Sequence, residues 1–202
     1  MSFCKFLSVA SFATALSVSI ASAATFTIDP GDVTVSGGDF CFPGNCKLDG
    51  SIKGGSFDLN NAGDTATLSD LFDWQVVTSS PWASGAGKYL VNATLNFSSP
   101  SPASTSGSGY AGFITLLGSV SGGVLAWTSG SGIVDFADGY RLSYTLKDAL
   151  KLGFGTGTTT GATFTLEEAP APAPVPLPAS ALLLLGGMGV LGGMRAKRQR
   201  AA

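Results

Sequence analysis

The chain has 202 residues, and 12% of them are charged. It contains no histidine. Without histidine, a Ser-His-Asp or Cys-His catalytic centre is excluded. Residues 29–168 hold 13 acidic and six basic residues, a net charge of −7, so the basic surface that nucleic-acid binding requires is missing. The low charge and the 28 glycines are typical of a secreted, turn-rich β domain.

The first 23 residues are typical of a secretory signal peptide. A lysine precedes the apolar segment 6–20, and residues 21–23 read Ala-Ser-Ala, which has the A-x-A form of a cleavage site. Cleavage between Ala23 and Ala24 would make Ala24 the first residue of the exported protein. A transmembrane anchor is the alternative, but the apolar segment is short for one.

Two cysteines remain after the predicted cleavage, and export favours a disulfide between them. Cys41 and Cys46 flank Pro43-Gly44, a dipeptide typical of turns. The closed loop is short, so we expect the bridge to stabilise a local hairpin by about 2 kcal/mol. A tetrahedral zinc site would lack ligands, because the chain offers no histidine, and a redox dithiol is more often C-x-x-C.

Apolar and polar residues alternate in four segments, at 66–76, 89–97, 140–147 and 162–167. A period of two predicts strands with one face on a core and one face in water. Asp138-Gly139 is a hairpin turn signal. For residues 24–166 we therefore predict an exported, all-β domain that is an antiparallel β-sandwich or jelly roll.

Glycine- and serine-rich stretches are predicted to separate roughly ten short strands. These stretches are 36–38, 54–56, 84–87, 98–109, 118–123, 129–132 and 153–161. Within them, Ser98–Ser108 is predicted to be a mobile loop. Residues 147–151 could form about one helical turn, and the Ala/Pro alternation of 167–176 predicts an extended stalk.

The C-terminal segment contains an apolar stretch followed by a basic tail. Residues 177–194 carry no charge and are just long enough for one transmembrane helix. The tail, residues 195–200, contains four basic side chains and predicts a cytoplasmic end by the positive-inside rule. These side chains are Arg195, Lys197, Arg198 and Arg200.

A short proline motif overlaps the start of this predicted helix. It reads Val175-Pro176-Leu177-Pro178-Ala179, and the order of motif, helix and basic tail over 175–202 resembles the VPLPA subclass of PEP-CTERM sorting signals. The resemblance implies a Gram-negative host and an exosortase-like membrane enzyme that cleaves near the motif. It also implies inner-membrane anchoring during sorting, then release to the cell envelope, surface or exterior. An unprocessed membrane anchor is the alternative.

Calcium is the one cofactor that the acidic residues suggest. Asp58, Asn60 and Gly63 begin a D-x-[DN]-x-[DN]-G pattern, but its fifth and twelfth positions are alanine and serine, so it fails as an EF-hand loop. Three further aspartates could meet around calcium in space, although scattered aspartates are usually only solvated. They are Asp64, Asp70 and Asp73. No other metal or cofactor is expected.

Aromatic residues suggest a sugar-binding surface as a second hypothesis. Trp82 follows Ser-Ser-Pro and is expected in an exposed loop, whereas Trp74 lies on an apolar alternation and is expected in the core. The other aromatic residues that could complete such a surface are Trp127, Tyr89 and Tyr110. A secreted hydrolase with paired carboxylates is a weaker alternative, because Glu167 and Glu168, the only glutamates, lie in the predicted stalk.

These observations predict an exported cell-envelope or extracellular-matrix protein with a non-catalytic β domain. Its expected partners are the exosortase-like enzyme, the inner membrane during sorting and, as the resemblance implies, an exopolysaccharide. A carbohydrate-binding surface module is the alternative, and a hydrolase is the lesser one.

Overall fold

The computed structural model describes residues 23–155, 157–171 and 186–188. The predicted signal peptide up to residue 22, the motif Val175–Ala179 and the basic tail 195–200 lie outside these described residues. Of the predicted helix 177–194, only residues 186–188 are described, and they are helical. Among the described residues, no helix is both long and apolar enough to cross a membrane.

Residues 21–170 form one compact unit, and its described part is all-β, as predicted, with no helix in 23–155 or 157–170. Its strands are β1 (Ala24–Ile28), β2 (Gly31–Phe42), β3 (Cys46–Ile52), β4 (Gly55–Leu59), β5 (Thr65–Thr78), β6 (Ser84–Ser99), β7 (Ala103–Leu116), β8 (Ser119–Ser129), β9 (Ser131–Asp135), β10 (Arg141–Leu146), β11 (Ala149–Gly155) and β12 (Gly157–Glu168). The last strand therefore includes Glu167 and Glu168, the first two residues of the predicted stalk.

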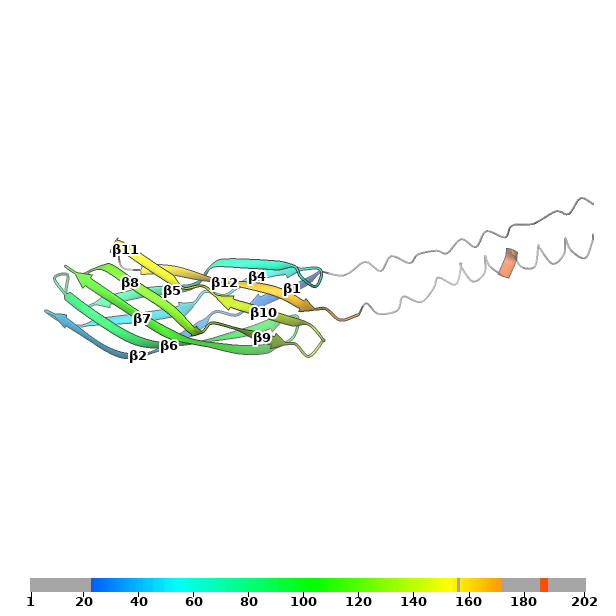
Figure 1. Cartoon of the computed structure of the whole chain (residues 1–202), viewed down its shortest axis with the longest axis horizontal. Coiled ribbons are helices and arrows are strands. Elements are labelled where there is room, and N and C mark those ends of the chain that lie inside the picture. Colours follow the sequence, from blue (N-terminus) through cyan, green and yellow to red (C-terminus); the bar gives the residue numbers. More distant parts are fainter. Residues whose placement is uncertain (1–22, 156, 172–185, 189–202) are drawn as a thin grey trace, which may run out of the picture. The chain divides into compact units, whose positions relative to one another are not determined.

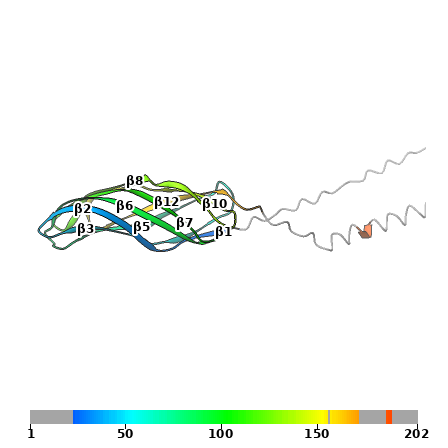
Figure 2. The same ribbon diagram turned by 90° about the horizontal axis from the view of Figure 1, so that it is seen from below.

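All strand pairs are antiparallel, and their order is β11-β8-β7-β6-β2-β3-β5-β12-β10-β9. This order has two halves, β11-β8-β7-β6 and β3-β5-β12-β10-β9. Strand β2 joins them, because Gly31 and Asp32 pair with β3 whereas Val33–Phe42 pair with β6. Strands β1 and β4 extend the half that contains β6. The halves lie face to face in a sandwich-like fold (Figures 1 and 2).

The predicted alternation correctly identifies the core. Every second residue from 89 to 97 of β6 is buried, and so are the inward residues of β10 and β12. Phe164 on β12 is fully buried and lies between the halves, 4.7 Å from the ring of Phe57 and 6.2 Å from that of Phe97. Such aromatic contacts contribute about 0.5–1.5 kcal/mol beyond area burial.

The prediction that glycine-rich stretches separate strands is wrong for 36–38, 84–87, 103–109 and 119–123, which lie inside β2, β6, β7 and β8. At Gly87 and Gly107 a larger residue would collide with core side chains. A Cβ atom on Gly87 would lie 2.7 Å from the ring of Tyr89, and one on Gly107 would lie 2.6 Å from Leu146 Cδ1.

Two further local predictions are wrong. The predicted mobile loop 98–108 is mostly strand, since β6 runs to Ser99 and β7 starts at Ala103, where Ala103 pairs with Phe97. The predicted helical turn 147–151 is also wrong, because β11 begins at Ala149 and pairs with Leu125 of β8. In both cases pairing with a distant strand decides the conformation, and local propensity does not.

Substituting alanine for Gly50 is expected to destabilise the fold by about 1–3 kcal/mol, the usual cost of overpacking a core. The added Cβ would lie 2.7 Å from Trp74 Cζ3 and 3.2 Å from Val33 Cβ. Urea denaturation measures the effect. Gly122→Ala is the matched control, because its Cβ would have no atom within 4 Å. Equal stability of both variants would contradict the packing described for Gly50.

Candidate functional site

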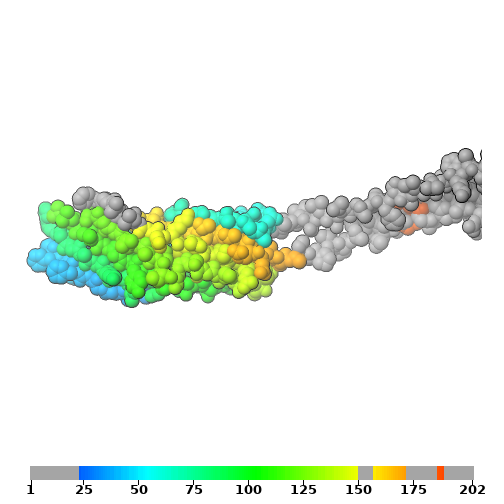
Figure 3. Space-filling view, viewed as in Figure 1, coloured from blue at the N-terminus to red at the C-terminus, as the bar shows by residue number. Residues whose placement is uncertain are grey.

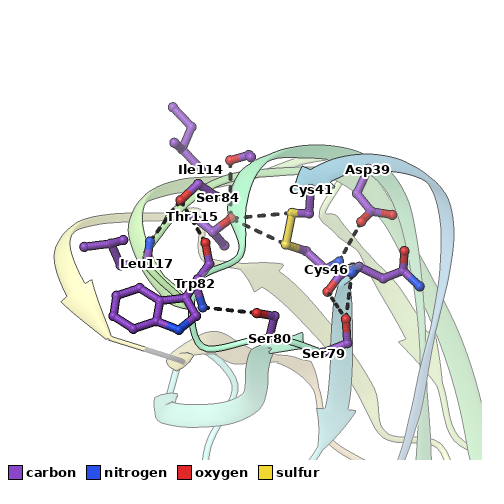
Figure 4. Close-up of a disulfide and its surroundings, with 12 residues drawn as sticks. Asp39, Cys41, Cys46, Ser79, Ser80, Trp82, Ser84, Ile114, Thr115 and Leu117 are labelled. Atoms are coloured by element: carbon purple, nitrogen blue, oxygen red, sulfur yellow. Dashed lines mark hydrogen bonds between the residues drawn. A yellow bond between two sulfur atoms is a disulfide. The ribbon is translucent and has the colours of Figure 1, made fainter. Parts of the chain in front are cut away.

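The two ends of the sandwich are formed by different strand ends and turns. Strand β1 starts and strand β12 finishes at the same end, where the N–H of Gly63, in the turn after β4, donates to the carbonyl of Leu166. The turns β2–β3, β5–β6 and β7–β8 gather at the opposite end, which carries the two cysteines (Figures 3 and 4). We call this the disulfide end.

Cys41 and Cys46 form a disulfide, as predicted, with their Cα atoms 5.8 Å apart. Its structural role differs from the expected local hairpin. Cys41 lies in the part of β2 that pairs with β6, whereas Cys46 starts β3 and pairs with Thr78 of β5. The bridge therefore ties one half of the sandwich to the other at the disulfide end.

Polar groups surround the bridge and fix both strands. The backbone N–H of Cys46 donates to Asp39 Oδ2 at 2.8 Å, and the hydroxyl of Thr115 lies 3.5 Å from Cys46 Sγ. Tyr89 donates to the carbonyl of Cys46 at 3.3 Å. Burial raises the pKa of Tyr89, and the charge of Asp39 raises it further, so its hydroxyl stays protonated as a donor.

Trp82 projects from the β5–β6 turn at this end, with 66% of its surface exposed. Its backbone is held firmly: its N–H donates to Ser80 Oγ at 3.3 Å, and its carbonyl accepts from Ser84 Oγ at 3.4 Å. Ser84 Oγ also accepts from the N–H of Leu117, which ties the β7–β8 turn to the same loop (Figure 4). The ring is thus displayed on an ordered turn.

The other aromatic residues do not join Trp82 in one surface. Trp74 is buried, as expected, and its ring lies 6.1 Å from that of Trp127, while Tyr89 stacks on Phe113 inside the core. Tyr110 is exposed on β7, where Lys88 lies 6.0 Å from its ring centre. Packing between the halves draws the inward-facing rings away from solvent.

The sequence prediction overlooked several exposed apolar side chains near Trp82. Phe40 and Phe42 are 78% and 75% exposed at the end of β2, and Ile114 and Leu117 are also exposed. The exposure of Phe40 and Phe42 follows from the alternation around Cys41. Since Cys41 points inward to its bridge, its neighbours at 40 and 42 must point outward.

A metal site is not supported by the acidic residues proposed for calcium. Within the described residues, the only group of three potential ligand atoms lying close together comes from Asp39, Cys41 and Cys46. Its two sulfurs are bonded to each other, so neither is a thiolate ligand. The candidates Asp64, Asp70 and Asp73 form no such group among these residues.

Asp64 instead stabilises the turn between β4 and β5. Its carboxylate accepts from the backbone N–H groups of Asn61 and Asn60, each at 2.9 Å, and these bonds hold the pKa of Asp64 below its ordinary value. The stabilisation is therefore expected above the unfolded-state pKa of about 3.9 and should be lost as pH falls through the lower folded pKa. An NMR titration showing a normal or raised pKa for Asp64 would contradict this turn geometry.

Comparison with known proteins yields no relative that could assign the site. No family model, no curated protein and no solved structure matches the chain. Its function must therefore be inferred from its own residues and geometry.

Proposed function

We propose that this chain is an exported protein of the cell envelope or extracellular matrix with a non-catalytic β domain. In this proposal the N-terminal signal is removed after Ala23, and an exosortase-like enzyme processes the chain near Val175–Ala179. The domain is then displayed on the cell surface or released.

The start of the folded domain carries the proposal. Ala24, the first residue after the predicted cleavage site, is also the first residue of β1, where it is buried and pairs with Leu59. Cleavage one residue earlier in the chain would leave the fold complete, and cleavage several residues later would remove core positions such as Phe26. The predicted cleavage site thus directly precedes the first described strand.

The disulfide supports the same route. Disulfides such as Cys41–Cys46 form and persist in the periplasm and outside the cell, and they are rare in the reducing cytosol. Strand β2, which carries Cys41 near its last residue, and strand β12 finish at opposite ends of the domain (Figure 1). A domain held through residues after Pro170 would therefore present Trp82 and the disulfide end away from its attachment.

Cell fractionation with altered proline motifs tests this function. In the double variant Pro176→Ala/Pro178→Ala, we expect the protein to stay in the inner membrane instead of reaching the surface or medium. Pro170→Ala/Pro172→Ala is the matched control, because it makes the same change in the stalk and should leave sorting intact. Normal release of the motif variant would contradict the proposal.

Carbohydrate binding is a second candidate function, and the exposure of Trp82 favours it. An exposed indole on an ordered turn can stack on a sugar ring, and Trp82 is the only tryptophan that the described residues leave largely exposed. Trp82→Ala is expected to abolish retention on a glycan array or on host exopolysaccharide. Phe40→Ala controls for general apolar adhesion. If Trp82→Ala binds as well as the unaltered protein does, this second function is wrong.

A further inference from the structure

One long strand edge of the sandwich has no partner. Residues Val33–Phe42 of β2 pair with β6 along one side. On the other side, only Gly31 and Asp32 pair with β3, and no other strand of the described residues pairs with this edge. Residues 36–40 are all exposed. Backbone N–H and C=O groups of such an edge remain free to pair with a further strand.

This edge has few of the features that usually block pairing. Exposed edges are commonly protected by lysine, proline, a bulge or short length, whereas 33–42 contains neither lysine nor proline and spans ten residues. Its single charge, Asp39, accepts a hydrogen bond from the Cys46 N–H. By contrast, edge strand β9 has only five residues and ends at Asp135.

We propose that β2 pairs with β2 of a second copy of this chain, antiparallel, with Gly38 opposite Gly38 of the second copy. A two-fold axis at Gly38 aligns residues 34–42 of both copies and makes the half containing β6 continuous across them. Antiparallel pairing places opposite residues on the same face. The exposed rings of Phe40 and Phe42 would then extend one outer surface.

Charge and side-chain size favour this register and this occupant. With Gly38 at the axis, Asp39 lies opposite Gly37 of the second copy, so the two carboxylates do not face each other. Phe40 lies opposite Ser36, and no bulky pair meets at the centre. A Cβ on Gly38 would have no atom within 4 Å, so a larger side chain can be placed at this position of the strand. The strand is thus complementary to itself.

The pairing also determines how two displayed domains could meet, and this consequence rests on the proposed function. Antiparallel β2 strands direct the two β12 ends in opposite directions. This geometry suits released copies or copies on facing cell surfaces, and it disfavours neighbours on one surface. Self-association would then link domains within a matrix, although the pairing itself does not depend on how the chain is sorted.

Disulfide trapping tests the proposed register on the full chain in mild detergent. In a Cys4→Ser background, Gly38→Cys should form an interchain disulfide under mild oxidation, because opposite Cα atoms in a sheet lie about 4.5–5.5 Å apart, within disulfide range. Gly122→Cys is the matched control. Gly122 is equally open to a Cβ but lies on β8, between β7 and β11, and should not cross-link.

A charged substitution at Gly38 provides a second, independent test of the dimer. Gly38→Lys should weaken the dimer several-fold in sedimentation velocity, because two lysines would face each other at the axis, whereas Gly38→Thr and Gly122→Lys should not. An uncross-linked Gly38→Cys chain, or a dimer insensitive to Gly38→Lys, would overturn the proposal. A monomeric wild-type chain would also overturn it and leave a foreign extended peptide as the occupant. None of these outcomes depends on sorting, so failure here and failure of the proposed function are separable.

Discussion

Replacing Phe164 with alanine is expected to lower the free energy of unfolding by about 3–5 kcal/mol. The side chain is fully buried on β12 and packs on Phe57 and Phe97 from the opposite half of the sandwich. Alanine would leave a cavity between the halves that rigid strands cannot fill. Because domains are commonly stable by only about 5–15 kcal/mol, the midpoint of urea denaturation should fall substantially.

Phe40 provides the matched control for this prediction. It undergoes the same chemical change in Phe40→Ala, but its side chain is 78% exposed, so stability should change by no more than about 0.5 kcal/mol. Similar losses in both variants would mean that Phe164 does not occupy the centre of the core. A large loss at Phe40 alone would mean that β2 is covered by something else.

Removing the disulfide in Cys41→Ala/Cys46→Ala is expected to cost about 2 kcal/mol from loop entropy. The loss of the bridge should destabilise both halves, because it connects β2, which pairs with β6, to β3, which pairs with β5. Hydrogen exchange should therefore rise at the disulfide end in β2, β3 and the start of β6, and not only within the turn. Denaturation under oxidising conditions measures the total effect.

Cys4→Ser serves as the control for the disulfide variant, since Cys4 precedes the predicted cleavage site and should not affect the stability of the exported protein. Equal stability of the double variant and the unaltered protein would show that the bridge contributes nothing to the fold. Faster exchange confined to residues 42–45 would instead support a purely local hairpin role.

Regular alternation allows much of the fold to be predicted from the sequence. In β6, β10 and β12, apolar residues at every second position identify both the strands and their buried faces. The signal is strong there because a period of two with large side chains is typical of a half-buried strand and does not fit a helix. The Asp138-Gly139 turn between β9 and β10 is recognised from its own dipeptide.

Where inward positions are glycine, this signal disappears. Gly107 and Gly109 occupy buried positions of β7, so the sequence of this strand resembles a serine-rich loop. The small size of Gly107 is required by Leu146, a residue of the opposite half that is far away in the sequence. Local composition cannot reveal such a requirement, because it arises only when the two halves pack together.

At the disulfide end, the predictions of the cysteine pair and of the exposure of Trp82 are confirmed. The predicted role of the bridge is not, because it depends on β2 leaving β3 after Asp32 to join β6. That crossover also creates the open edge of β2. Neither feature has a sequence signal of its own, since both follow from the order of strands in the sheet.

The most direct test of the proposed export and sorting is the intact mass of the protein recovered from its host envelope and medium. We predict a chain that begins at Ala24, ends near Pro178 and is about 2 Da lighter than its reduced form because of one disulfide. A mass that includes residues 1–23, or one that retains Arg195 to Ala202 in every fraction, would contradict the proposal.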